Sequence, residues 1–337
     1  MHRTIGRLSA ALTGFLVFSY AMTASAEPPK LKVGFDTIPT HLAPVIFRIP
    51  EAVQHYGKDY TIEFTRFRGS ALQLQAIASG EVDLGVLAFS SFATGIVNAH
   101  LPIKAVADVA QDGPWFSTVY CVRADSPIKT LKDLKGATIA VNAFGGAVDL
   151  AARSLVLKEG LKPNTDVNFI EANFANEEAM LRENKIQVAG LVEPFWSYAE
   201  ANGQVRQLFT QRDGLGTTEF LFFGARQDVI AAKRDLLVKF FADYVRGIRY
   251  VTDPKNRDRV LQVVGELNNQ PASKFAPWAL LKGKDYYHDP NGLVNADALQ
   301  ANVDELAKLG QLKQSFDVHP YIDNSLVEEA AKTLAQK

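Results

Sequence analysis

The sequence predicts an α/β fold of two lobes, each a mainly parallel sheet flanked by helices, joined by a two-strand hinge. Strand and helix patterns alternate, as where the period-two run 61–67 is followed by an apolar-faced helix between Gly69 and Gly80. Residues 80–92 also align without a gap against residues 184–196, with apolar residues in matching places. This repeat indicates two similar lobes, although any two strand–helix units resemble each other to some degree.

The first 26 residues are predicted to be a secretory signal peptide and not part of the fold. Arg3 and Arg7 give it a positive start, and residues 8–22 are mostly apolar but too short to span a bilayer comfortably. Residues 24–26 read Ala-Ser-Ala, a small-residue cleavage site. An uncleaved membrane anchor is the alternative. The signal predicts an exported, periplasmic protein.

The remaining chain is slightly acidic and contains one cysteine. Two of the 36 Lys and Arg lie in the signal, which leaves 34 against 37 Asp and Glu, a net charge of −3. Such a chain is a poor partner for nucleic acid. Because Cys121 has no second cysteine to pair with, the core must carry the stability. A chain of roughly 300 residues usually forms two domains.

The order of the predicted elements sets the lobe boundaries. Strands are predicted at residues 31–35, 61–67 and 82–87 and within 139–146, with helices from Ala43 towards His55, from Gly69 and from Gly146, and a helical chain from Asp228 onward. Strand-like runs at 105–110, 118–124 and 220–225 are the expected crossings between lobes. We therefore expect lobe 1 at residues 27–116 and 225–337, and lobe 2 at residues 117–224.

Loops at the carboxyl ends of the strands are the expected ligand contacts, since open α/β sheets bind ligands there. The candidates in these loops are Gly69, Ser70, Phe89, Ser90, Ser91, Phe144, Gly145 and Gly146. Free N–H groups at a helix start suit an anionic or polar group, and glycines let the backbone approach a ligand closely. Ordinary helix capping is the alternative for the three serines.

Four further side chains are candidate ligand contacts: Arg68, Trp115, Glu193 and Phe195. Arg68 directly precedes a helix start and is the first choice, over Arg66 and Arg123, to pair with a carboxylate or sulfonate. Glu193 would accept from a ligand amine or ring N–H, or pair with a lysine or arginine of its own lobe. The aromatic residues near these loops favour a flat ligand.

Four segments, in this order, carry a family resemblance: 71–83, with its Ala-Ile-Ala-Ser-Gly-Glu-Val-Asp; 126–136, with Thr-Leu-Lys-Asp-Leu-Lys-Gly; 139–146; and Lys158 to Leu161. Through them, residues 31–330 resemble the periplasmic solute-binding proteins of ABC importers, in the nitrate/sulfonate/taurine and thiamine-precursor branch. The resemblance implies a monomer whose hinge closes over a small ligand. It also implies partners: an inner-membrane permease with its cytoplasmic ATPase.

The resemblance also implies a role for His41 and a class of ligand. The loop around His41 is similar to the N-terminal loop of pyrimidine-precursor binders, where histidine contacts the ligand; a surface histidine is the alternative. We expect a small organic anion, a sulfonate or carboxylate, aromatic ones included. A pyrimidine-type heterocycle, or a receptor that presents its ligand to a membrane sensor, is the alternative. No nucleophile-elbow, phosphate-loop or zinc motif appears, so we expect no enzyme, cofactor or metal.

Overall fold

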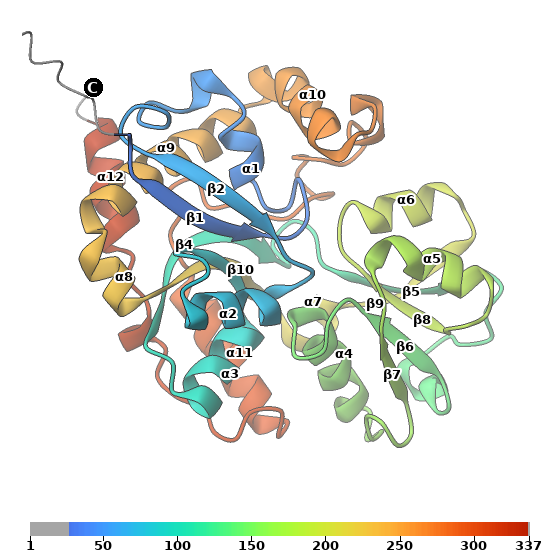
Figure 1. Ribbon diagram of the computed structural model, residues 1–337. Helices are drawn as coiled ribbons and strands as arrows, with labels where there is room; N and C mark the ends of the chain where they lie inside the picture. Colours follow the sequence, from blue (N-terminus) through green and yellow to red (C-terminus); the bar gives the residue numbers. More distant parts are fainter. Residues whose placement is uncertain (1–26, 336–337) are drawn as a thin grey trace, which may run out of the picture.

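The computed structural model describes residues 27–335, and the predicted signal peptide lies outside them. Two lobes stand side by side, each with its own sheet (Figure 1). The sheet of lobe 1 comprises β1 (Lys30–Phe35), β2 (Thr61–Arg66), β3 (Gly85–Ala88), β4 (Ile103–Asp112) and β10 (Thr218–Arg226). Their spatial order is β2-β1-β3-β10-β4, because a parallel bridge between Val33 and Leu84 joins β1 to β3. Only β10 runs antiparallel to its neighbours.

The sheet of lobe 2 repeats this arrangement. It comprises β5 (Val119–Arg123), β6 (Thr138–Val141), β7 (Asn168–Glu171), β8 (Val188–Leu191) and β9 (Val205–Thr210), in the spatial order β7-β6-β8-β5-β9. Here β5 is the antiparallel strand. The repeated segments of the sequence contribute β3 and β8, which hold the same central place in their sheets. The predicted α/β class and mainly parallel sheets are confirmed.

Helices cover both sheets (Figure 1). They are α1 (Ala43–Ile46), α2 (Ser70–Ser79), α3 (Phe89–Ala99), α4 (Ala147–Lys158), α5 (Phe174–Arg182), α6 (Phe195–Ala201), α7 (Gln211–Leu215), α8 (Gln227–Ala232), α9 (Arg234–Thr252), α10 (Arg257–Asn268), α11 (Ala296–Lys308) and α12 (Ser325–Ala335). None of the helices within residues 27–335 is long and apolar enough to cross a membrane.

One predicted helix is shorter than expected. The helical pattern from Ala43 towards His55 ends at Ile46, and a 3-10 turn follows at Pro50–Ala52. Pro50 is the physical reason, because a proline disfavours helical backbone in the residue before it. Ile49 accordingly has φ −111° and ψ 100°, an extended conformation.

The crossings between lobes differ from the expected boundary at one end. The first crossing lies between β4 and β5, at residues 113–118, close to the predicted boundary at 116. The second lies between β9 and β10, at residues 211–217. Residues 218–224 were expected in lobe 2, but β10 pairs with β3 and β4 and therefore belongs to lobe 1. A central strand looks apolar in either sheet, so its pattern alone does not say which one it joins.

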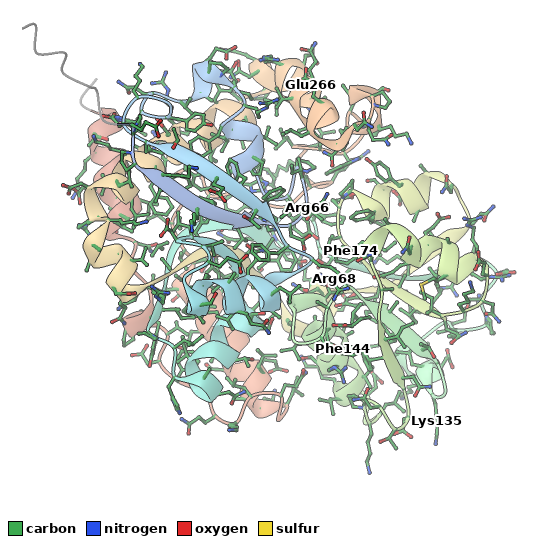
Figure 2. The ribbon with its side chains drawn as sticks, in the orientation of Figure 1. Arg66, Arg68, Lys135, Phe144, Phe174 and Glu266 are labelled. Atoms are coloured by element: carbon green, nitrogen blue, oxygen red, sulfur yellow. The ribbon has the colours of Figure 1, made fainter. Side chains whose placement is uncertain are left out.

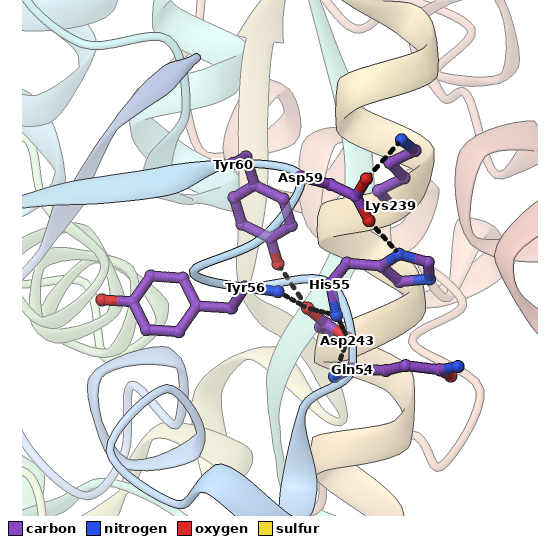
Figure 3. Close-up of polar contacts among 7 residues, drawn as sticks. All are labelled: Gln54, His55, Tyr56, Asp59, Tyr60, Lys239 and Asp243. Carbon is purple, nitrogen blue, oxygen red and sulfur yellow. Dashed lines mark hydrogen bonds and ion pairs between the residues drawn. The ribbon is translucent and has the colours of Figure 1, made fainter. Parts of the chain in front are cut away.

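A buried carboxylate fastens the loop before β2 onto α9. Asp243 accepts hydrogen bonds from the backbone N–H groups of Gln54, His55 and Tyr56 at 2.6–3.1 Å, and from the Tyr60 hydroxyl at 2.8 Å (Figure 3). We call this arrangement the Asp243 cluster. Because every donor is met by the charged oxygens, the cluster holds the loop in place without leaving a polar group unpaired.

Candidate ligand-binding cleft

A cleft lies where the carboxyl ends of the central strands of both lobes meet. It encloses about 460 Å³ of space, part of it open to solvent. The lining residues are Asp36, Thr37, Thr40, His41, Gly69, Ser70, Gln73, Val86, Ala88, Asn142, Gly146, Ala147, Val148, Phe174, Val192, Phe220 and Leu221. Apolar residues make up much of the wall, and polar groups are few.

Three helices begin at this cleft. Their N-cap residues Gly69 (α2), Ala88 (α3) and Gly146 (α4) all line it, and none of the three N-termini has a side-chain cap. The first backbone N–H groups of a helix have no partner within the helix, and the helix dipole makes this end attractive to an anion. Two of the helices belong to lobe 1 and one to lobe 2, so an anion between them would contact both lobes.

His41 supplies a neutral donor to the same cleft. It is only 4% exposed, and its Nδ1 accepts from the backbone N–H of Asp36 at 3.1 Å. Nδ1 is therefore unprotonated and the proton sits on Nε2. Burial, then the positive charge of Arg66, lowers the pKa of His41 to about 3. Within residues 27–335, nothing else bonds the ring, which leaves the Nε2–H group for a ligand.

Serine hydroxyls connect the lobes beside the helix starts. Ser70 Oγ and Ser91 Oγ lie 2.9 Å apart, and Ser91 donates to the Gly145 carbonyl across the cleft at 3.2 Å. On either side, Asn142 donates to the Arg68 carbonyl at 3.1 Å and Thr40 to the Glu193 carbonyl at 3.3 Å. Since these bonds run from lobe to lobe, the molecule is in a closed arrangement.

Asp36 is the acidic group of the cleft. Its backbone carbonyl accepts from Arg66 Nε at 2.9 Å, while its carboxylate receives no hydrogen bond from the described residues. Burial, partly offset by the positive charge of Arg66, raises the pKa of Asp36 to about 7. The carboxyl is thus close to half ionised at neutral pH and ready to respond to a ligand's charge.

The mouth of the cleft carries the arginines. Figure 2 shows Arg66 and Arg68 from lobe 1 near Phe174 of lobe 2, and all three line an outer hollow of about 840 Å³ together with Phe195. Phe174 stacks on Phe195 with ring centres 5.4 Å apart. Arg68 is exposed here and does not line the inner cleft. Its guanidinium is therefore placed to attract an anion from solution rather than to enclose it.

The structure brings together only part of the predicted site. His41, Gly69, Ser70 and Gly146 line the inner cleft, and Arg68 and Phe195 line its mouth. Ser90, Ser91 and Gly145 form the bridge behind it. Phe89 is fully buried, whereas Phe144 is 45% exposed on the rim of lobe 2 (Figure 2). Trp115 and Glu193 line a different hollow, described below.

Sequence reasoning did not identify Asp36, Thr37 and Asn142 as cleft residues, although their positions directly after strands indicated it. Asp36 and Thr37 directly follow β1, and Asn142 directly follows β6. The rule that ligands bind at the carboxyl ends of strands applies to these residues as much as to Gly69. Gln73, Phe220 and Leu221 carried no such signal, because they lie within a helix and a strand.

Glu193 and Cys121 do not offer charge or reactivity to the cleft. Glu193 is 1% exposed, and its carboxylate accepts from the Ser197 hydroxyl and N–H at 2.9 and 3.2 Å. Burial, then the charge of Asp285, raises the pKa of Glu193 to about 8. Cys121 is fully buried in β5, where burial raises the pKa of its thiol. The expected pairing of Glu193 with a lysine or arginine is therefore replaced by a bond to its own helix start.

Comparison with known proteins identifies the family. The NMT1/THI5-like family model matches residues 61–257. A protein of Escherichia coli K12 described as aliphatic sulfonates-binding is 26% identical over 224 residues, covering 65% of this chain and 66% of its own length, slightly under two thirds.

Solved structures agree on the fold. The alkanesulfonate-binding protein of Xanthomonas axonopodis pv. citri, bound to MOPS, matches with a TM-score of 0.69 and 18% identity, over 89% of this chain and 99% of its own. The nitrate-binding protein of Synechocystis PCC 6803 matches with a TM-score of 0.73 and 17% identity, over 92% and 90%. The chain has the periplasmic binding protein fold and belongs to the NMT1/THI5-like family.

Proposed function

We propose that this protein is an exported solute-binding receptor of an ABC import system. It captures a small organic anion, a sulfonate or carboxylate, by closing its hinge, and delivers the ligand to an inner-membrane permease driven by a cytoplasmic ATPase. The family membership and the sulfonate- and nitrate-binding relatives support this assignment. We assign binding rather than catalysis, because the relatives named above are binding proteins.

The observation that carries the proposal is the set of three uncapped helix starts in one cleft. Because Gly69, Ala88 and Gly146 provide no side-chain cap, the first backbone N–H groups of α2, α3 and α4 are left to whatever occupies the space between the lobes. An anion there completes bonds on both lobes at once and so favours the closed arrangement over the open one. Among residues 27–335, no lysine or arginine lines the inner cleft, so backbone dipoles and His41 would supply the attraction.

Asp36 favours the second candidate, a heterocycle of the pyrimidine type. An unpaired carboxyl beside the Nε2–H donor of His41 offers both an acceptor and a donor to a ring that carries N–H groups and nitrogen lone pairs. The two candidates differ in charge. An anion would keep Asp36 protonated, whereas a ligand with an amino or ring N–H group would use its carboxylate as an acceptor.

Thermal unfolding of the protein from residue 27 onward, against a panel of ligands, tests the proposal. The panel contains alkyl and aryl sulfonates, aryl carboxylates, nitrate and pyrimidines. A ligand that binds only the folded state raises the melting temperature, and calorimetry then gives its Kd. We expect one class of anion to raise it, and His41→Phe to weaken binding about tenfold or more, through loss of a hydrogen bond to charge.

His319→Phe is the matched control, because His319 is an exposed histidine outside the cleft. It should leave the Kd unchanged. A shift with pyrimidines alone would replace the anion assignment with the heterocycle. Equal loss of affinity in both histidine variants, or no shift with any compound of the panel, would contradict the proposal.

A further inference from the structure

A second hollow lies between the lobes, away from the cleft. It encloses about 1690 Å³, part of it open to solvent, and shares no lining residue with the cleft or its mouth. All three tryptophans of the chain, Trp115, Trp196 and Trp278, line it, together with Phe116 and Tyr198. We call this hollow the aromatic groove. It also contains Trp115 and Glu193, two of the predicted ligand contacts that do not line the cleft.

The walls of the aromatic groove belong to different lobes. Tyr198 lies on α6 of lobe 2, while the facing segment 273–284 follows α10 of lobe 1. The walls meet at one edge, where Lys274 Nζ lies 5.5 Å from the centre of the Tyr198 ring, and Phe275 packs edge-on against the same ring at 6.4 Å. Trp115, in the first crossing between lobes, closes one end. The groove therefore changes width whenever the lobes rotate.

The charges of the groove are unevenly distributed. Two exposed lysines, Lys274 and Lys284, stand on the lobe 1 wall, and the exposed Glu200 stands on the other. Glu193 contributes little negative charge at neutral pH, since burial keeps its carboxyl protonated. The lobe 1 wall thus offers two cations beside aromatic rings.

We propose that the aromatic groove is a second binding site, for a small aromatic carboxylate. Its ring packs against the half-buried rings of Trp115, Phe116 and Tyr198, and its carboxylate pairs with Lys274 and Lys284. Aromatic rings gain from such packing beyond the area they bury, and the two lysines select an anion over a neutral ring. The site exists in the closed arrangement, so an occupant contacting both walls favours that arrangement and couples to the cleft through the hinge.

Tryptophan emission reports on this groove, because all three tryptophans line it and none lines the cleft. The probe is benzoate, titrated without any other ligand. Cyclohexanecarboxylate has the same charge without the aromatic ring, and benzyl alcohol has the ring without the charge. We expect benzoate to change the emission saturably, and the double variant Lys274→Ala/Lys284→Ala to raise its Kd at least tenfold. Both lysines are exposed, so the variant should keep the wild-type circular dichroism.

Lys135→Ala is the matched control, since Lys135 is an exposed lysine on the far side of lobe 2 (Figure 2). It should leave the benzoate titration unchanged. A response that does not saturate, that benzyl alcohol reproduces at the same concentration, or that survives loss of both lysines would overturn the proposal. So would a response lost in His41→Phe but kept in the lysine variant, because the ring would then bind in the cleft.

Discussion

The Asp243 cluster and the cleft use the same kind of donor, the backbone N–H group, in opposite ways. In the cluster, backbone N–H groups of Gln54, His55 and Tyr56 converge on a carboxylate that the chain itself provides. In the cleft, the N–H groups at the starts of α2, α3 and α4 converge on a space that no side-chain oxygen enters as a cap. The first arrangement is complete within the fold, and the second is completed by a ligand.

The difference shows that the protein gains stability at the Asp243 cluster and loses some at the uncapped helix starts of the cleft. A buried donor without a partner costs about 1–3 kcal/mol relative to one that is paired. Evolution commonly meets that cost with an N-cap side chain such as Ser, Thr or Asp. Glycine and alanine at the three N-caps of the cleft leave the donors for an external anion, a local departure from good capping of the kind expected at functional sites.

Breaking the cluster should have the largest effect on stability. Asp243→Ala removes the acceptor of four donors, of which the Tyr60 hydroxyl is fully buried and the three backbone N–H groups are half-buried. We therefore expect the free energy of unfolding to fall by about 3–5 kcal/mol, measured by urea denaturation. Asp59→Asn is the control, since Asp59 pairs with His55 and Lys239 at the surface and should cost far less stability than Asp243→Ala (Figure 3). A loss below about 1 kcal/mol for Asp243→Ala would show that the cluster does not hold the loop.

Placing a carboxylate of the chain itself on a helix start in the cleft should abolish ligand binding. Gly146 has φ −81° and ψ 172°, the backbone of an ordinary N-cap, so Gly146→Asp places a carboxylate on the start of α4. We expect Kd for the anion to rise at least 100-fold, about 2.7 kcal/mol. The added Cβ lies 3.2 Å from the Ala143 carbonyl oxygen, a tight contact that any side chain at this position shares. Gly146→Ala adds the same Cβ without the oxygens and should bind within a few-fold of wild type. Equal losses in both variants would indicate a steric effect instead.

The charge of Asp36 should make binding depend on pH. A bound anion disfavours the ionised carboxyl and raises its pKa above about 7, so binding takes up a proton. Affinity should therefore be highest below pH 6 and fall as pH rises through 7, by up to about tenfold per unit. Asp36→Asn should flatten the profile in calorimetric titrations between pH 5.5 and 8.5. Affinity that rises with pH would indicate a ligand with a positively charged amino group.

Arg68 should have the smallest effect of the four. It is exposed at the mouth and outside the inner cleft, so it should speed the encounter with an anion more than hold it. We expect Arg68→Gln to lower the association rate about two- to threefold at low salt, with little difference at high salt, in stopped-flow measurements. A loss of affinity larger than that of His41→Phe would return Arg68 to the role of direct counter-charge.

The local sequence pattern correctly predicted the strand–turn–helix segment that begins with β6 in lobe 2. The run 139–146 is predicted to be a buried strand and a glycine turn that opens a helix, and the structure has β6, the turn at Gly145 and α4 from Ala147 there. This succeeded because strand periodicity and positive-φ glycine act over a few residues. The helix after Ala43 was wrong in length, since the effect of Pro50 on Ile49 outweighed the apolar spacing.

The sequence by itself determined the fold class, the repeat of two units, the helix starts at Gly69 and Gly146, and the candidacy of His41. These are properties of short segments and of their order. Tertiary structure alone decided that β10 belongs to lobe 1, that Gln73 and Phe220 face the cleft, and that Trp115 and Glu193 line a separate groove. The reason is that strand pairing and the linings of the cleft and the groove bring together residues that lie far apart in the chain, and no short segment of the sequence specifies those contacts.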